Sequence, residues 1–513
     1  MLGKSSGVAM LITDVLAERV RSRGAHPFIR HEGRAVSYAE FDRLSNRAAH
    51  ALRSLGVVTG DRVTLAFGNS VEYLVTAFGA LKAGAILHPT NPALGASELA
   101  YIVGHARPRV LVTDAANAER VGRPALALPG ETRVAVFGDA PDADVAFDAL
   151  LARSPDQPCG VGIEAGDGST LLYTSGTTGT PKGVLFRHHS TGAASRHFIE
   201  LLGIGADDTI LAVTPLFHGN AWGAACTALE AGGTVAYPQV FRASEFWPLV
   251  HHTRASVLYT LGTILAILLA QEPSDAERDN PLRVILGLGS APIRDRVIQR
   301  FGVRDVAECF GSTDAGVVTM TPLGAPPRIG SAGPAVPGVT LRIADDAGHP
   351  LPPRAVGEIL IDSPHRMAEY FHDPEQTAAA LREGWFCTGD LGYLDEDGWL
   401  YFVDRKRDVI RRGGENMSSV LIEKTLCEHP AVAEAAVIGV PDPVLGQEVK
   451  AFIVAKAPVT ADELRAFAST RLAKFQVPRL WEFRDALPKT PTQRVEKYKL
   501  RQESGGGDKP LLG

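Results

Sequence analysis

Helix-type and strand-type segments alternate through the first 300 residues of this 513-residue chain, and this alternation limits the folds it can adopt. Ser37, followed three residues later by Glu40, has the pattern of a helix N-cap, and the apolar residues after it recur at a helical period. Strands separated by helices favour parallel sheets covered by helices. Strands are expected at 62–67, 85–88, 209–213, 234–237, 257–258 and 283–286, and a further helix at 71–82. The pattern predicts an α/β fold with a large N-terminal domain of parallel sheets.

The sequence pattern changes in the C-terminal third of the chain. Short apolar runs between Gly, Pro and Asp turns predict a β-rich subdomain over 334–403. After Asp408, a unit of about 100 residues is expected to be an α+β domain, because helix and strand patterns again alternate. Its helices are expected at 418–427 and 461–472, and its strands at 431–440 and 449–454. The predicted domains are 1–404, a hinge at 405–408, a small C-terminal domain at 409–503 and a disordered tail at 504–513.

Composition excludes several classes of protein. The net charge of −6 gives no reason to expect nucleic acid as a partner. The five cysteines are scattered and form no Cys-x-x-Cys pair, so neither a disulfide framework nor a zinc site is expected, and a reducing cytoplasm fits. The longest apolar run, 257–270, is short for a membrane span and is expected to be a buried helix.

The segment 173–184 combines hydroxyl-bearing residues, glycines and one lysine, Lys182. Such a loop can offer backbone N–H groups, hydroxyls and an ammonium to a polyphosphate. It is not a Walker A loop, because Pro181 stands where that motif has its second glycine and Gly183 follows the lysine in place of Ser or Thr. An ordinary polar surface loop is the alternative interpretation of this segment alone.

This segment resembles the phosphate loop of the adenylate-forming superfamily, which includes acyl-CoA synthetases, aryl-CoA ligases, adenylation domains and luciferases. The resemblance covers nearly the whole chain, because further motifs follow in the order of the family. They lie at 81–85, 215–219, 287–292, 310–314, 385–390, 404–408 and 413–416. Each motif alone has an ordinary structural explanation, but together they identify the chain as similar to AMP-forming acyl-CoA synthetases.

The resemblance implies a site for AMP. The phosphate loop would be formed by Thr174, Ser175, Gly176, Thr177, Thr178, Gly179 and Lys182. The adenine and ribose would be held by Gly289, Ser290, Ala291, Pro292, Phe310, Gly311, Ser312, Asp390 and Arg405. Phe310 can stack on a purine, and a carboxylate such as Asp390 can accept hydrogen bonds from two ribose hydroxyls.

The resemblance also implies a two-step reaction. A carboxylate first attacks the α-phosphorus of ATP to give acyl-AMP and pyrophosphate, and the thiol of coenzyme A then expels AMP. The C-terminal domain would rotate at Arg407 between the steps. Residues implied in catalysis are His218, Thr313, Asp314, Arg494 and Lys497, with Asp314 as a weak candidate to bind Mg²⁺. The acyl pocket would include His218, Asn220, Trp222, Thr260 and Gly262, and the loop at Gly413 and Gly414 would serve coenzyme A.

The chain departs from the family in its C-terminal motif, which usually ends in a glycine and a lysine that bridges the carboxylate and the α-phosphate. Here these positions hold Gln493 and Arg494. Arginine is larger and planar, and it directs its charge differently from a compact ammonium. Loss of a charge that acts in the transition state costs on the order of 10²–10³ in rate.

A second departure is Asp314, where the family usually has a magnesium-binding glutamate. The shorter side chain moves the carboxylate by roughly 1.5 Å, and Mg²⁺ tolerates little deviation from its preferred geometry. A bound Mg²⁺ is therefore doubtful. A third departure is Glu369, where glycine is commoner, and we have no functional account of it.

Two of these departures fall on adenylation, so the sequence suggests an enzyme that keeps acyl transfer from acyl-AMP to coenzyme A while adenylation is impaired or lost. It would then depend on a small acid supplied as acyl-adenylate, and a separate adenylating enzyme would be its partner. Three alternatives stay open: a complete ATP-dependent acyl-CoA ligase, a non-catalytic acyl-adenylate-binding protein, and transfer to a carrier-protein thiol. Glycines and alanines near His218 suggest room for a bulky apolar acid, although they also suit helix packing.

Overall fold

In the computed structural model, the described residues are 10–140, 143–174, 181–192, 195–326, 328–406, 408–412, 415–489 and 495–504. They divide into two compact units. The first unit contains the described residues up to 174, with 181–340 and 362–381, and the second contains 341–361 and 382–504. The predicted hinge lies within the second unit, and the predicted domain boundaries stay a prediction.

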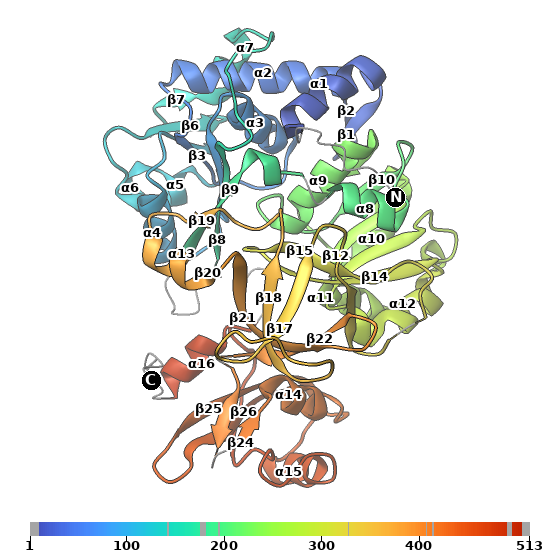
Figure 1. Ribbon diagram of the computed structural model, residues 1–513. Helices are drawn as coiled ribbons and strands as arrows, with labels where there is room; N and C mark the ends of the chain where they lie inside the picture. The colour runs from blue at the N-terminus through green and yellow to red at the C-terminus, as the bar shows by residue number, and fades with distance from the viewer. Residues whose placement is uncertain are drawn as a thin grey trace. The chain divides into compact units, whose positions relative to one another are not determined.

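The first unit contains two large sheets, each covered by helices (Figure 1). One has the strand order β15-β14-β13-β12-β10-β11-β1-β2, and its inner strands pair in parallel. Its strands are β1 (Pro27–His31), β2 (Arg34–Ser37), β10 (Thr209–Ala212), β11 (Thr234–Ala236), β12 (Val257–Leu261), β13 (Val284–Leu288), β14 (Asp305–Ser312) and β15 (Gly316–Met320). Its helices are α8 (Ser195–Leu202), α9 (Gly219–Ala231), α10 (Phe246–Thr253), α11 (Gly262–Leu269) and α12 (Arg294–Phe301).

The second sheet of this unit has the order β19-β9-β8-β4-β3-β5-β6-β7. It consists of β3 (Arg62–Leu65), β4 (Ile86–Pro89), β5 (Val110–Asp114), β6 (Arg133–Phe137), β7 (Val145–Ala146), β8 (Gly168–Thr174), β9 (Lys182–Arg187) and β19 (Glu369–Tyr370). The strand β9 is antiparallel to both of its neighbours, which makes β8 and β9 a hairpin. The predicted phosphate loop therefore joins two adjacent strands.

Helices complete this unit. They are α1 (Ile12–Arg23), α2 (Tyr38–Ser54), α3 (Val71–Lys82), α4 (Ala96–Ala106), α5 (Ala118–Val121), α6 (Arg123–Leu126), α7 (Phe147–Arg153) and α13 (Pro374–Ala380). The predicted N-cap at the start of α2 is confirmed, because the Ser37 hydroxyl accepts a hydrogen bond from the backbone N–H of Glu40 at 3.2 Å. The helix α2 packs on α3, and the Lys82 ammonium lies 2.6 Å from the Asp42 carboxylate across this contact.

The apolar run 257–270, in which both a strand at 257–258 and a buried helix are expected, is a strand followed by a helix. Its first half, β12, contains β-branched and aromatic residues that suit a strand, and Gly262 then begins α11. The helix α11 is only partly buried, with Ile267 41% exposed, so the apolar character of the run did not show where the strand ends and the helix begins. Among the described residues, no helix has the length and apolar character that crossing a lipid bilayer requires.

The second unit contains two smaller sheets. In the first, β17 (Thr340–Ala344), β18 (Gly357–Asp362), β21 (Trp385–Leu394) and β22 (Trp399–Arg405) lie in the order β22-β21-β18-β17, and β20 (Leu381–Arg382) pairs with β21. The strand β16 (Ser331–Pro334) precedes them in the chain. The predicted β-rich subdomain is thereby confirmed.

The C-terminal sheet has the order β24-β23-β26-β25, and β27 pairs in parallel with β26. Its strands are β23 (Ile410–Arg412), β24 (Glu415–Met417), β25 (Val432–Asp442), β26 (Gly446–Ala455) and β27 (Leu480–Phe483), and its helices are α14 (Ser419–Cys427), α15 (Ala461–Ser469) and α16 (Lys497–Glu503). Apolar residues from β25, β26, α14 and α15 form its core. The α+β character predicted for this segment is correct.

Candidate functional site

The turn after β13 is held by a buried carboxylate that the sequence motifs did not identify. Glu308 lies on β14 beside this turn, and its carboxylate accepts hydrogen bonds from the N–H of Gly289 at 2.7 Å, the N–H of Ala291 at 2.6 Å and the Ser290 hydroxyl at 3.0 Å. Glu308 is 5% exposed. Burial raises its pKa, and the three donors oppose that shift. A single acidic residue inside an apolar strand, two positions before Phe310, is the signal that could have revealed it.

The start of α11 lies directly against the same turn. A Cβ atom on Gly262 would be 2.2 Å from the carbonyl oxygen of Gly289, so no larger residue fits without moving the backbone. The structure therefore brings together a residue predicted for the acyl pocket and one predicted for adenine binding.

The segment from Phe310 to Asp314 ends β14 and turns back into β15. The Ser312 hydroxyl accepts a hydrogen bond from the N–H of Ala315 at 3.2 Å, which closes the turn that carries Thr313 and Asp314. A Cβ atom on Gly311 would be 2.3 Å from the carbonyl oxygen of Gly316, so the two strands approach closely here. Phe310, Gly311 and Ser312 thus lie together at one strand end.

Asp314 is connected to the phosphate-loop strand by a tyrosine. The Tyr370 hydroxyl donates a hydrogen bond to Asp314 Oδ1 at 2.8 Å, and the Lys182 ammonium lies 4.8 Å from the centre of the Tyr370 ring. Tyr370 pairs with Val184 because β19 lies beside β9. Burial, followed by the charge of Asp314, raises the pKa of the Tyr370 hydroxyl. The sequence motifs singled out its neighbour Glu369 and missed Tyr370.

His218 caps the N-terminus of α9. Its Nδ1 accepts a hydrogen bond from the N–H of Asn220 at 3.2 Å, so the proton of the neutral ring lies on Nε2. Burial lowers the pKa of His218, which favours this neutral form. Asn220 Oδ1 accepts a hydrogen bond from the Thr214 hydroxyl at 3.1 Å, and the Trp222 ring packs at 5.7 Å from Phe78. These residues have well-defined partners on the α9 side of the sheet.

In the second unit, two residues predicted to hold the ribose are brought together. Asp390 and Arg405 are register partners on β21 and β22, and Arg405 Nε lies 3.6 Å from Asp390 Oδ1. Both side chains are largely buried, so the pair is fixed more firmly than an exposed ion pair would be.

Lys497 begins α16 and is part of a polar network. Its ammonium lies 2.7 Å from Glu423 Oε1 and donates a hydrogen bond of 2.7 Å to the Ser419 hydroxyl. Asp404 accepts hydrogen bonds from the N–H of Ser419 at 2.6 Å and from its hydroxyl at 2.9 Å. Burial raises the pKa of Glu423, and Lys497 opposes this shift. To reach a nucleotide, Lys497 would have to leave these partners.

Several predicted site residues lie outside the described residues: Ser175, Gly176, Thr177, Thr178, Gly179, Arg407, Gly413, Gly414 and Arg494. The side chain of Pro292 is also outside the description, although its backbone belongs to the short helix Ala291–Ile293. Thr174 and Lys182 flank the phosphate loop and are register partners on β8 and β9. The two ends of the loop are therefore fixed by the sheet.

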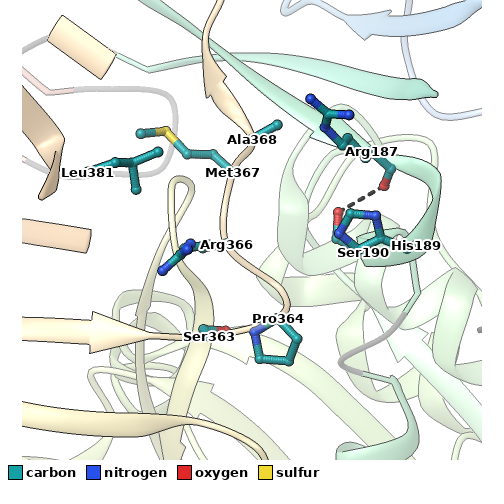
Figure 2. A pocket seen from close by; sticks show the side chains of 9 residues that line it. All are labelled: Arg187, His189, Ser190, Ser363, Pro364, Arg366, Met367, Ala368 and Leu381. Atoms are coloured by element: carbon teal, nitrogen blue, oxygen red, sulfur yellow. Dashed lines mark hydrogen bonds between the residues drawn. The ribbon is translucent and has the colours of Figure 1, made fainter. Parts of the chain in front are cut away.

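A separate hollow of about 270 Å³ lies beside β9 (Figure 2). Figure 2 shows Arg187, His189 and Ser190 grouped on one side, with the segment 363–368 running past them. No acidic residue is among the nine described residues that line it, and none of the predicted site residues lines it. The hollow is therefore distinct from the predicted acyl pocket.

Family comparisons identify the family of the chain. The model for "AMP-binding enzyme" matches residues 16–371, and the model for "AMP-binding enzyme C-terminal domain" matches residues 421–494. The chain is 35% identical over 484 residues to a feruloyl-CoA synthase of Amycolatopsis sp, covering 93% of this chain and 96% of that protein. It is 34% identical over 508 residues to a crotonobetaine/carnitine–CoA ligase of Salmonella paratyphi A, covering 95% of this chain and 98% of that protein.

Among solved structures, the chain resembles the anthranilate CoA ligase AuaEII in complex with anthranoyl-AMP. The TM-score is 0.88 at 27% sequence identity, and the match covers 97% of this chain and 98% of that one. The matched part of the chain includes residues of both units.

Proposed function

This chain belongs to the AMP-binding enzyme family and is an adenylate-forming enzyme of the acyl-CoA synthetase type, and we propose that it transfers an acyl group from acyl-AMP to coenzyme A faster than it makes acyl-AMP from ATP. The observation that carries this proposal is Arg494, which stands where the resemblance expects a lysine. The C-terminal family match ends at this residue. A planar guanidinium cannot place its charge as a compact ammonium does.

Two arrangements in the structure support the proposal. Lys497, the nearby lysine that could replace the missing charge, is held by Glu423 and Ser419. One carboxylate oxygen of Asp314 accepts a hydrogen bond from the Tyr370 hydroxyl, so one lone pair of this carboxylate is already used. Both observations concern groups that would act in adenylation.

The thioester half of the reaction requires that the adenylate be held while a thiol attacks its carbonyl carbon. The turn fixed by Glu308 and the strand end at Phe310 would hold the adenine, and Asp390 with Arg405 would hold the ribose hydroxyls. Thr313 and the phosphate loop would donate hydrogen bonds to the phosphate. His218, neutral and protonated on Nε2, would border the acyl group and could donate a hydrogen bond near it.

Asp314 fits Mg²⁺ in part. Its second carboxylate oxygen makes no hydrogen bond or ion pair with the described residues, and Mg²⁺ is commonly held by one carboxylate with phosphate oxygens and water. Where bound, the ion would neutralise charge on the pyrophosphate. Asp314 would hold the ion through this second oxygen, with Tyr370 keeping the carboxylate in place.

The test compares two routes to the same thioester. Purified protein receives either acid, ATP and coenzyme A, or synthetic acyl-AMP and coenzyme A, and thioester is measured by chromatography. We expect the acyl-AMP route to be faster by on the order of 10² or more. Arg494→Lys should raise only the ATP route, and Lys489→Arg serves as a matched control for a charge-preserving exchange nearby. Equal rates by both routes, or no gain in Arg494→Lys, would contradict the proposal.

A complete ATP-dependent ligase is the second candidate, and the names of the relatives favour it. Rapid exchange of labelled pyrophosphate into ATP would support this candidate. If adenylation is slow, a separate enzyme would supply the acyl-AMP. We place the reaction in the cytoplasm, where ATP and coenzyme A are available, and the relatives named above point to aryl or short polar acids as the first to test.

A further inference from the structure

Two histidines face each other in the first unit. Nε2 of His197, on α8, lies 3.1 Å from Nε2 of His365, and the two ring centres are 5.2 Å apart. The segment that carries His365 precedes β19. At 3.1 Å, one of these nitrogens must carry a proton and the other must accept it, so at least one ring is neutral.

The histidine pair adjoins the turn that carries Asp314. The Cβ of His365 lies 3.6 Å from the place that a Cβ on Gly316 would take, and Gly316 is the register partner of Ser312. The N–H of Met367 donates a hydrogen bond of 2.7 Å to the carbonyl oxygen of Asp314, which fixes this segment to the same turn. On the other side, Phe198 follows His197 and packs against Tyr259 at 5.8 Å.

One buried polar atom of this pair, Nδ1 of His365, lacks a hydrogen-bond partner among the described residues, and His365 is 7% exposed. A buried polar atom without a partner costs about 1–3 kcal/mol. Such atoms are uncommon in folded proteins, and a bound ligand is one way in which they are satisfied.

The pair can adapt to its ligand. If His365 accepts through Nε2, its Nδ1 carries a proton and is a donor; if it donates through Nε2 as a neutral ring, its Nδ1 is an acceptor. A hydroxyl group can answer either state, because it both donates and accepts. An alkyl group cannot bond to Nδ1 in either state, and a carboxylate offers acceptors alone.

We propose that His197 and His365 are specificity-determining residues that recognise a hydroxyl substituent on the acyl group. The preferred substrates are then hydroxylated acids, and His197 sets the tautomer of His365. This inference rests on the proposed function, because it assigns the substrate class of the same site.

The test measures binding, so that it does not depend on adenylation. Non-hydrolysable acylsulfamoyl-adenosines are titrated calorimetrically in matched pairs: benzoyl and 4-hydroxybenzoyl, cinnamoyl and 4-hydroxycinnamoyl, octanoyl and 8-hydroxyoctanoyl. We expect the hydroxylated member of at least one pair to bind roughly tenfold more tightly. This preference should disappear in His365→Phe and His197→Phe. It should persist in His189→Phe, a matched control in the neighbouring hollow, and in part in His197→Gln, which keeps a donor and an acceptor.

The outcomes separate the two proposals. Tight binding of analogues with no preference in any pair, or a preference that survives both His→Phe variants, overturns this inference and leaves the proposed function standing. Failure of the wild-type protein to bind any analogue overturns the proposed function itself. An adipoyl analogue that binds better than every hydroxylated one would overturn the hydroxyl assignment in favour of an anion. Thermal unfolding of each variant shows that a loss of preference is not a loss of fold.

Discussion

Both units contain a carboxylate that binds neighbouring groups, but the partners of the carboxylate differ between the units. In the first unit, Glu308 holds a backbone turn through two N–H groups and one hydroxyl. In the second unit, Glu423 faces the ammonium of Lys497 at 2.7 Å, and Glu448 faces the guanidinium of Arg412 at 2.7 Å. The partners of Glu308 are neutral hydrogen-bond donors, whereas the partners of Glu423 and Glu448 carry a full positive charge.

This difference bears on how each unit can work. Backbone N–H groups cannot move away from Glu308 without unfolding the turn, so the geometry of the turn predicted to bind adenine is built into the fold. Charged side chains such as Lys497 can exchange one partner for another, because their stems are flexible. The first unit has a turn of fixed geometry, and the second has charged side chains that can change partners. This combination suits an enzyme that catalyses two successive steps.

The largest expected effect comes from breaking the first arrangement. Glu308→Ala removes the acceptor of three donors and leaves the N–H groups of Gly289 and Ala291 buried without a partner. We expect a loss of about 2–4 kcal/mol in unfolding free energy and a loss of roughly a hundredfold in affinity for an acylsulfamoyl-adenosine. Calorimetric titration and denaturant unfolding measure both quantities.

Asp305→Ala is the matched control for this change. Asp305 is also buried on β14, but it pairs with Arg294 at 2.5 Å and does not hold the turn. The control should lose stability while its affinity for the analogue changes little. If both variants lose affinity equally, the loss of affinity in Glu308→Ala does not come from the turn.

A smaller effect is expected from breaking the second arrangement. Lys497→Met leaves Glu423 without its counter-charge, and side-chain exposures of 12% for Lys497 and 18% for Glu423 allow some relief from water. We expect about 2–3 kcal/mol of destabilisation. The double variant Lys497→Met with Glu423→Met should recover most of it, because an apolar pair replaces a charged one. Denaturant unfolding of the four proteins in this cycle gives the coupling, and strict additivity would show that the pair contributes nothing.

The smallest effect per residue is expected from mild acid, and it should fall on the first unit. Burial lowers the pKa of His88 to about 3 and, with His197 as a further cause, that of His365 to about 4. An unfolded histidine takes up its proton near its ordinary pKa, whereas these folded ones do not. As the pH falls from 7.5 to 5.5, the unfolded state gains protons and the unfolding free energy drops by about 1.4 kcal/mol per histidine.

Calorimetry at the two pH values measures this loss. His88→Gln should reduce the pH dependence by about that amount. A pH dependence that is the same with and without His88 would show that its burial is not the cause.

Much of the fold follows from local patterns. The helix α3 has the predicted bounds, and Ser37 caps α2 as its sequence indicated, because capping and helical periodicity are properties of neighbouring residues. The run 257–270 shows the limit of this approach: the strand β12 and the helix α11 form one mainly apolar run in the sequence, and the residues that pack around them decide where the strand ends.

The candidate site, too, was predicted only in part from the sequence. Motif order placed Gly289, Phe310 and Asp390 in one predicted nucleotide site, and family comparison confirms the family while these assignments stay predictions. Glu308 and Tyr370 were missed because their roles depend on atoms brought close by sheet pairing. The pairing of His197 with His365, 168 residues apart, has no counterpart in any local pattern.

By itself, the sequence determined the class of fold, the family and the substitution at Arg494, because these are recorded in residue types and their spacing. The tertiary structure decided which charges are already paired, which buried polar atoms lack partners and which glycines touch another backbone. Such facts depend on distances between residues far apart in the chain. Hydrogen bonds and ion pairs act over a few ångströms, so they are fixed only when strands and helices have been packed together.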